Sequence, residues 1–256
     1  MIQNASVDTE QKTDSVKLTY CGKYQNIAVL TLNRADKANA YDAKVLDCLQ
    51  DKLAIVISNP TVRVMIITNV GKVFCAGADK STLSHRTHRD AFILQSRNLF
   101  DKIAKIPWPT IAAMQGPALA GGLELALACD IRLCSASSWF GFPETELGLI
   151  PAAGGIRRLT EIVGPARAKE VILSGRQIDH STALQWGLVT KISHDVLVTA
   201  TTLAEDIQSR DTLAIHLAKM TFCALSHPMQ NDAIEAISQA FLYDKRHSDD
   251  TCNISE

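Results

Sequence analysis

The chain has 256 residues, of which 46% are hydrophobic and 21% charged, a balance typical of a globular protein with a substantial core. The 26 Lys and Arg residues are matched by 27 Asp and Glu residues, and the formal net charge of −1 offers no electrostatic attraction for nucleic acid or an anionic membrane. No apolar run reaches membrane-spanning length, and the polar N-terminus resembles neither a signal nor a transit peptide. These features predict a soluble, cytoplasmic protein with no nucleic-acid or membrane partner.

The first half of the chain alternates predicted strands and helices. Residues 1–14 are polar and predict a flexible tail. Apolar and β-branched runs then predict strands, and apolar residues at helical spacing predict helices. The strands are expected over 16–20, 27–32, 64–68, 109–115 and 131–134, and the helices over 45–57 and 90–105. Short apolar strands that alternate with helices indicate an α/β fold with largely parallel strands.

The second half is predominantly helical in its pattern. From Gly154 onward, helical spacing recurs over 156–163, 166–173, 181–186, 196–209, 212–225 and 229–243. We expect a boundary near residues 190–200, which divides the chain into the tail 1–14, an α/β core 15–195 and a helical C-terminal region 196–256. Seven cysteines without a CxxC pair, several of them in apolar stretches, predict free buried thiols.

Two loops rich in small residues follow predicted buried strands. The first is Phe74-Cys75-Ala76-Gly77-Ala78-Asp79, and the second, 115–122, leads into a helix through Gly121 and Gly122. Bare backbone N–H groups in such loops bind anions or a polarised carbonyl oxygen, and two loops together form an oxyanion hole. The alternative is an ordinary tight turn in which Asp79 caps the next segment. Neither loop is a P-loop or a GxGxxG motif.

Two glutamates stand in surroundings that packing alone does not explain. Glu124 interrupts an Ala/Leu-rich run, and Glu144 follows an aromatic and proline stretch. A buried charge is costly unless it is paired, hydrogen-bonded or protonated, and two carboxyl groups in one cleft suit proton transfer to and from a water. Helix capping remains the alternative for each of them.

The sequence gives little indication of a cysteine nucleophile or a metal site. A lone cysteine beside a glycine loop, such as Cys75, is more often inert than nucleophilic. The seven histidines show no HExxH motif or paired metal spacing, so no metal site is expected.

Several motifs in the same order make the chain resemble the enoyl-CoA hydratase/isomerase (crotonase) superfamily from about Val16 to His247. They are Leu32-Asn33-Arg34 with Asn39-Ala40, Phe74 to Asp79, Ala118 to Asp130, and Pro143-Glu144 followed by Gly148, Pro151, Gly154-Gly155 and Arg158-Leu159. The resemblance implies a spiral of ββα units with a helical C-terminal region that forms a homotrimer or a dimer of trimers.

The resemblance also implies a set of site residues. It assigns catalysis to Glu124 and Glu144, and an oxyanion hole to the backbone N–H groups of Ala76 and Gly121. It implies coenzyme A and substrate binding around Lys37, Ala38, Ala76, Gly77, Ala78, Asp79 and Gly121. Phe74 and Phe142 are the candidates for the acyl pocket, Phe142 because it stands where many hydratases carry a smaller or polar residue. Coenzyme A is part of the substrate, and no separate cofactor is expected.

The family contains several reactions, and both glutamates are present here, as in its hydratases. This favours a 2-enoyl-CoA hydratase, with a Δ3-Δ2-enoyl-CoA isomerase or a 3-hydroxyacyl thioester dehydratase as alternatives. An RNA-binding relative is disfavoured because the helix 42–58 carries Lys44 and Lys52 against three aspartates. A catalytically silent acyl-CoA-binding scaffold would lack the carboxylates.

Overall fold

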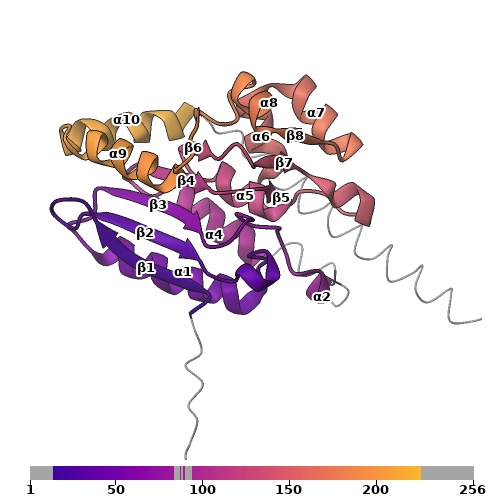
Figure 1. Cartoon of the computed structure of the whole chain (residues 1–256), viewed down its shortest axis with the longest axis horizontal. Helices are drawn as coiled ribbons and strands as arrows, with labels where there is room; N and C mark the ends of the chain where they lie inside the picture. The colour runs from indigo at the N-terminus through magenta and orange to yellow at the C-terminus, as the bar shows by residue number, and fades with distance from the viewer. Residues whose placement is uncertain (1–13, 84–86, 88, 90–93, 226–256) are drawn as a thin grey trace, which may run out of the picture.

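The computed structural model of the chain describes residues 14–83, 87, 89 and 94–225 (Figure 1). The predicted N-terminal tail and the predicted helix 229–243 lie outside the described residues. In the first half, the structure forms β1 (Val16–Cys21), β2 (Ile27–Leu32), the 3-10 helix η1 (Ala35–Lys37), α1 (Ala43–Ser58), β3 (Val64–Asn69), α2 (Lys80–Leu83), α4 (Gln95–Ala104), β4 (Thr110–Met114), β5 (Ala118–Leu119), α5 (Gly121–Leu127) and β6 (Ile131–Cys134).

The second half continues with shorter elements. They are β7 (Trp139–Gly141), the 3-10 helix η2 (Pro143–Leu147), α6 (Gly155–Val163), α7 (Pro165–Ser174), β8 (Gln177–Asp179), α8 (His180–Gln185), β9 (Lys191–Ile192), α9 (Val196–Gln208) and α10 (Thr212–Leu225). The long elements match the sequence predictions to within a few residues, whereas β5, β7, β8 and β9 were not predicted.

A six-stranded sheet organises the molecule, with strand order β1-β2-β3-β4-β6-β9. β1 and β2 form an antiparallel hairpin in which Val16 pairs with Leu32, and every other neighbouring pair in this sheet is parallel. Parallel strands are buried on both faces, which explains why β3 and β4 read as continuous apolar runs. The predicted α/β class with largely parallel strands is therefore confirmed.

Helices cover both faces of this sheet (Figure 1). α1 begins at the N-cap Asp42, whose side chain accepts the Val45 N–H, and its buried residues face β1 and β2. On the opposite face, α9 packs against β3 and β4, where Val196, Ala200 and Ala204 are completely buried. The predicted boundary at 195/196 thus coincides with the start of a helix, but that helix packs on the sheet as a layer of the core.

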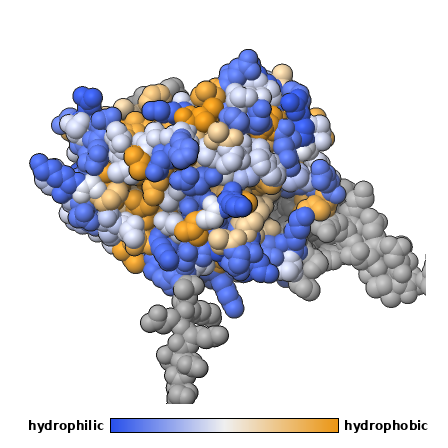
Figure 2. Space-filling model, in the orientation of Figure 1, coloured by the Kyte–Doolittle hydropathy of each residue, from blue (hydrophilic) through white to orange (hydrophobic). Residues whose placement is uncertain are grey.

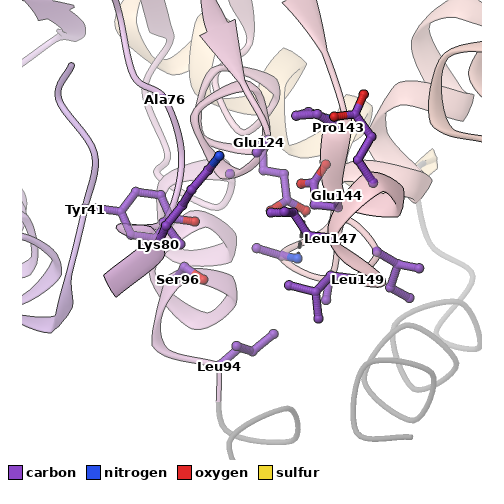
Figure 3. Close-up of a pocket in the computed structure, with 17 residues that line it drawn as sticks. Tyr41, Ala76, Lys80, Leu94, Ser96, Glu124, Pro143, Glu144, Leu147 and Leu149 are labelled. Carbon is purple, nitrogen blue, oxygen red and sulfur yellow. Dashed lines mark hydrogen bonds between the residues drawn. The ribbon is translucent and has the colours of Figure 1, made fainter. Parts of the chain in front are cut away.

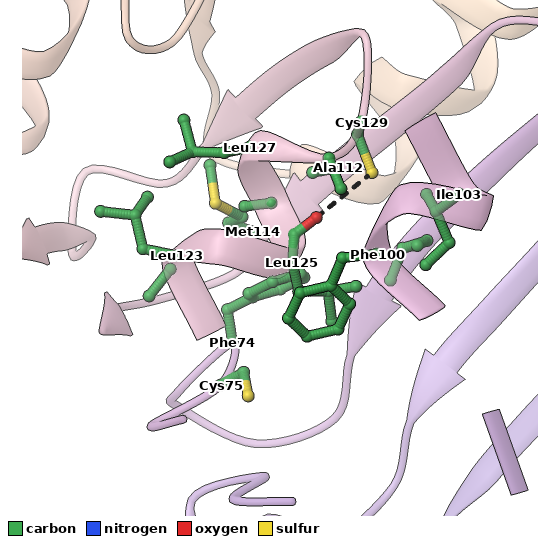
Figure 4. Packing of buried hydrophobic residues seen from close by; sticks show 14 of the residues in the cluster. Phe74, Cys75, Phe100, Ile103, Ala112, Met114, Leu123, Leu125, Leu127 and Cys129 are labelled. Atoms are coloured by element: carbon green, nitrogen blue, oxygen red, sulfur yellow. Dashed lines mark hydrogen bonds between the residues drawn. The ribbon is translucent and has the colours of Figure 1, made fainter. Parts of the chain in front are cut away.

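A second sheet of three short strands, in the order β5-β7-β8, lies beside the first. β5 precedes α5, and all seven residues of α5 are buried, as Figure 4 shows for Leu123, Leu125 and Leu127 among Phe74, Phe100 and Ile103. An isolated bridge between Cys75 and Ala118 brings the loop after β3 against β5. This contact places the two small-residue loops side by side.

The five cysteines whose side chains the structure describes are free, as expected: Cys21, Cys48, Cys75, Cys129 and Cys134. Three of them, Cys75, Cys129 and Cys134, are buried, and burial raises the pKa of each thiol to about 12. Cys75 donates to the Asn39 carbonyl at 3.1 Å. These thiols pack as small apolar side chains, and the interpretation of Cys75 as an inert residue fits its surroundings.

Candidate active site

A cavity of about 140 Å³ lies where the two small-residue loops meet α4, η2 and the segment before α6. Figure 3 shows Glu124 and Glu144 close together at this cavity, with Tyr41 and Lys80 across from them. The structure therefore brings together the two acids that the sequence singled out. The lining residues are Tyr41, Ala76, Ala78, Lys80, Leu94, Ser96, Ala120, Gly121, Glu124, Pro143, Glu144, Glu146, Leu147, Leu149, Ile150, Ala152 and Ala153.

The second loop brings the start of α5 unusually close to its neighbours. A Cβ on Gly122 would lie 2.0 Å from the Cys75 carbonyl oxygen, and one on Gly121 would lie 1.8 Å from the Tyr41 hydroxyl oxygen. Only glycine allows both approaches. Within the described part of the chain, the Gly121 N–H has no hydrogen-bond acceptor, and it stands at the positive end of α5 beside the cavity.

The first loop corrects one predicted residue role. The Ala76 N–H is already engaged, because it donates to the Ala38 carbonyl at 3.1 Å. Tyr41 binds the backbone on both sides of Ala78. Its N–H donates to the Gly77 carbonyl at 2.9 Å, and its carbonyl accepts a hydrogen bond from the Asp79 N–H at 2.8 Å. Between these two bonds, the Ala78 N–H has no acceptor among the described residues. The predicted N–H donor of Ala76 is thus wrong for this loop, and Ala78 supplies the unengaged N–H at the cavity.

Glu124 is a buried carboxylate held by a neighbouring helix. Its side chain is 3% exposed, and its Oε1 accepts the Ala153 N–H at 2.7 Å and the Gly155 N–H at 2.9 Å. These two donors belong to the start of α6, where backbone N–H groups and the helix dipole favour negative charge. The capping alternative, in which Glu124 serves its own helix in solvent, is therefore wrong: the carboxylate is buried and bound to the start of another helix.

Glu144 is in the opposite situation. It opens η2 after Pro143, as its capping alternative predicted, but among the described residues its buried Oε2 has no hydrogen-bond partner. Burial, and secondarily the charge of Glu124, raises the pKa of Glu144 to about 9. The pair is therefore unequal: the raised pKa of Glu144 favours its protonated form at neutral pH, and the Glu124 carboxyl group accepts hydrogen bonds from two backbone N–H groups. Two acids whose environments differ in this way are suited to complementary acid and base roles.

The residues predicted to bind coenzyme A lie around the first loop. Lys37 is exposed at the end of η1, and Ala38 follows it with a left-handed backbone, φ 50°. The Asp79 carboxylate pairs with Arg34 at 3.5 Å and accepts a hydrogen bond from the Ser81 hydroxyl at 2.8 Å. The Ser81 bonds, with smaller effects from Arg34 and Lys37, lower the pKa of Asp79. Asp79 is thus bound within the protein, and its predicted role in binding the substrate stays a prediction.

The two candidate acyl-pocket residues are placed elsewhere. Phe74 and Phe142 are both completely buried within the main hydrophobic core, and neither belongs to the residues that line the cavity. Their apolar character marks core packing, so the predicted acyl-pocket role is wrong. The apolar side chains that do line the cavity are Leu94, Leu147, Leu149 and Ile150.

Sequence reasoning missed several lining residues. Tyr41 and Ser96 bring hydroxyl groups to the cavity from segments far from both loops, and no short motif marks them. The Ala153 and Gly155 donors to Glu124 have a visible signal in the pair Gly154-Gly155, because glycines allow close approach of side chains.

Metal-binding and membrane-spanning features can be assessed for the described residues, 14–83, 87, 89 and 94–225. They contain no cluster of three or more His, Cys, Asp or Glu residues arranged to hold a metal ion. None of the helices there is long and apolar enough to span a bilayer, and Figure 2 shows hydrophilic and hydrophobic side chains intermingled on the face it presents. The expected cytoplasmic location and trimeric assembly stay predictions.

An α/β fold that places two N–H groups without acceptors among the described residues and two unequal carboxyl groups around one cavity defines an enzyme site suited to polarising a carbonyl and transferring protons beside it. The sequence pattern of the enoyl-CoA hydratase/isomerase family matches residues 22–253. The chain is 35% identical over 225 residues to a probable enoyl-CoA hydratase of Mycobacterium bovis, covering 87% of this chain and 84% of that one. It is 39% identical over 214 residues to a putative enoyl-CoA hydratase/isomerase of Bacillus subtilis, covering 80% of each.

A solved structure shows the same relationship. The crystal structure of an enoyl-CoA hydratase from Bacillus anthracis superposes with a TM-score of 0.79 at 33% identity and covers 89% of both chains. The chain belongs to the enoyl-CoA hydratase/isomerase family, and its fold is the crotonase fold that the motifs predicted.

Proposed function

We propose that the protein is a 2-enoyl-CoA hydratase. The observation that carries this proposal is the unequal pair of glutamates at one cavity, in which Glu144 Oε2 is buried without a hydrogen-bond partner among the described residues and the Glu124 carboxyl group is held by two N–H groups. Hydration needs a base for water and an acid for the adjacent carbon, and this pair supplies one of each. The relatives named as hydratases support the same reaction.

In the proposed reaction, a water lies between the two carboxyl groups. Glu124 accepts a proton from the water as its oxygen bonds to Cβ of the conjugated acyl chain. The electron pair of the double bond moves toward the thioester oxygen, where the Ala78 and Gly121 N–H groups stabilise the developing charge. Glu144 donates its proton to Cα, so that one water is added across the double bond. The pair is left with one proton in total, and its transfer from Glu124 to Glu144 restores the starting state.

The reverse dehydration uses the same groups, and an isomerase remains the second candidate because relatives carry both names. An isomerase moves one proton between Cα and Cγ and has no use for a bound water, so one carboxyl group suffices. The presence of two carboxyl groups in unequal environments at one cavity favours hydration. Coenzyme A as the thiol carrier, no further cofactor and a trimeric assembly belong to the same proposal.

The test follows the ultraviolet absorbance of a conjugated 2-enoyl-CoA such as the four-carbon ester. We expect absorbance loss with the wild type, and a decrease in kcat of about 10²- to 10⁴-fold in Glu124→Gln and in Glu144→Gln. Glu161→Gln removes an exposed carboxylate of α6 outside the cavity and serves as the matched control. Absence of hydration across a panel of 2-enoyl thioesters, with turnover of 3-enoyl thioesters, would assign the isomerase reaction instead.

A further inference from the structure

We infer that Arg158, together with Asp101, is a positioning pair that holds the Glu124 carboxylate in its reactive orientation. The effect of this pair on turnover depends on the proposed hydratase function, but its effect on the backbone around Glu124 does not. Neither side chain lines the cavity, so the pair acts on the reaction through the chain segment that precedes α6.

The contacts run in sequence from α4 to the carboxylate. Arg158 Nη2 forms an ion pair with Asp101 Oδ1 on α4, and Arg158 Nη1 donates to the Ala153 carbonyl at 3.0 Å. The N–H of the same residue, Ala153, donates to Glu124 Oε1 at 2.7 Å. Ala153 is therefore held from its carbonyl side by the guanidinium while its N–H side holds the carboxylate. A fixed guanidinium fork makes such a two-point attachment directional.

The glycine pair of this segment is shaped around the two side chains. Gly154 has φ 99°, and a Cβ there would lie 2.2 Å from Arg158 Nη1. A Cβ on Gly155 would lie 2.9 Å from Glu124 Oε1. One glycine thus makes room for the guanidinium and the next makes room for the carboxylate. These two close approaches give a physical reason why the sequence places Gly154 and Gly155 shortly before Arg158.

The Arg158–Asp101 pair is partly buried, so removal of either partner affects the segment before α6. The Arg158 side chain is 5% exposed, and its buried guanidinium is paired with Asp101, whose side chain is 26% exposed on a different helix. The neighbouring Arg157 also approaches Asp101, at 3.9 Å, and its Nη1 pairs with Glu161 at 3.3 Å. Arg157 and Arg158 therefore share a helix, a charge and one partner, and the inference rests on the hydrogen bond that Arg158 Nη1 donates to the Ala153 carbonyl.

The experiment compares Arg158→Gln, Asp101→Ala and the matched control Arg157→Gln in the full chain. The first readout is kcat and KM for 2-enoyl-CoA hydration. We expect Arg158→Gln to lower kcat by about 10- to 100-fold, the effect of a displacement near 1 Å, with KM changed less than twofold. Asp101→Ala should act in the same direction to a smaller extent, and it covers the case in which Arg158→Gln does not fold. Arg157→Gln should retain the wild-type kcat.

The second readout is amide hydrogen exchange at Ala153 and Gly155, which needs no substrate. Exchange at both positions should be faster in Arg158→Gln or Asp101→Ala than in Arg157→Gln. If the wild type hydrates no substrate, the proposed function fails while this exchange result still decides the positioning role. Equal exchange and equal kcat in the Arg158 and Arg157 variants would overturn the inference. A higher KM together with a lower kcat, without a local change in hydrogen exchange, would also overturn the inference in favour of a general structural role.

Discussion

Replacing Glu144 by Gln tests the protonation state on which the proposed chemistry depends. Glutamine keeps the size of the side chain and is neutral at every pH. In the wild type the native carboxyl has a pKa raised to about 9, whereas an unfolded glutamate titrates near its ordinary value of 4.5. Between these values the native state binds one more proton than the unfolded state, so stability falls as pH rises.

The magnitude follows from proton linkage. One proton of difference changes the free energy of unfolding by about 1.4 kcal/mol for each pH unit. From pH 5.5 to 7.5 the wild type should therefore lose about 3 kcal/mol relative to Glu144→Gln, and the difference should stop growing near pH 9. Taking the difference between the two proteins cancels the titration of shared groups that do not interact with Glu144, and Glu124 has a neutral neighbour in both proteins over this pH range.

Chemical denaturation at three or four pH values between 5.5 and 7.5 measures this slope. Glu161→Gln, which removes an exposed carboxylate, is the control and should run parallel to the wild type. Parallel stability curves for the wild type and Glu144→Gln would refute the reasoning, because they would show that Glu144 is ionised in the native state at neutral pH. The assignment of Glu144 as the proton donor would fall with it.

Three further predictions concern the reaction and the core. Because Glu144 must be protonated to donate to Cα, kcat for hydration should be flat near neutral pH and fall about tenfold per pH unit above pH 9; a flat profile to pH 10 would contradict this. Gly122→Ala should destabilise the fold by about 3 kcal/mol or more, measured by denaturation, because its Cβ would lie 2.0 Å from the Cys75 carbonyl oxygen. Lys219→Met should cost about 2 kcal/mol in the same assay, because Lys219 Nζ donates to Asp130 at 2.7 Å from a side chain only 7% exposed; unchanged stability would show that this contact contributes nothing.

Long buried elements were predictable because their patterns repeat. The run 64–68 matches β3, and the helical spacing over 212–225 matches α10, since several turns or a whole apolar strand carry the signal. The strands β5 and β9 have two residues each, too few to show any period. They exist because longer neighbours offer them hydrogen-bonding edges, which is a property of the fold and not of the segment.

The site was predictable where it depends on residue type. Glu124 and Glu144 stand out because an acid in an apolar run is costly, and both reach the cavity. Donor assignment within the first loop was not predictable in this way, because the Ala76 N–H is engaged by the carbonyl of Ala38, 38 positions earlier. The sequence also does not show which way a side chain points. Phe142, two positions before Glu144, is completely buried in the core.

The three buried thiols can report local opening of the protein around the active site. A thiol whose pKa is near 12 is almost entirely un-ionised at pH 8, and thiolate is the form that alkylating reagents attack. Labelling of Cys75, Cys129 and Cys134 therefore requires the protein to open around them. Cys75 lies in the loop that supplies the Ala78 N–H, and Cys129 follows the helix that carries Glu124. The rate of labelling at each cysteine, measured by mass spectrometry, would report how often the segments around the active site open, and it requires no substrate.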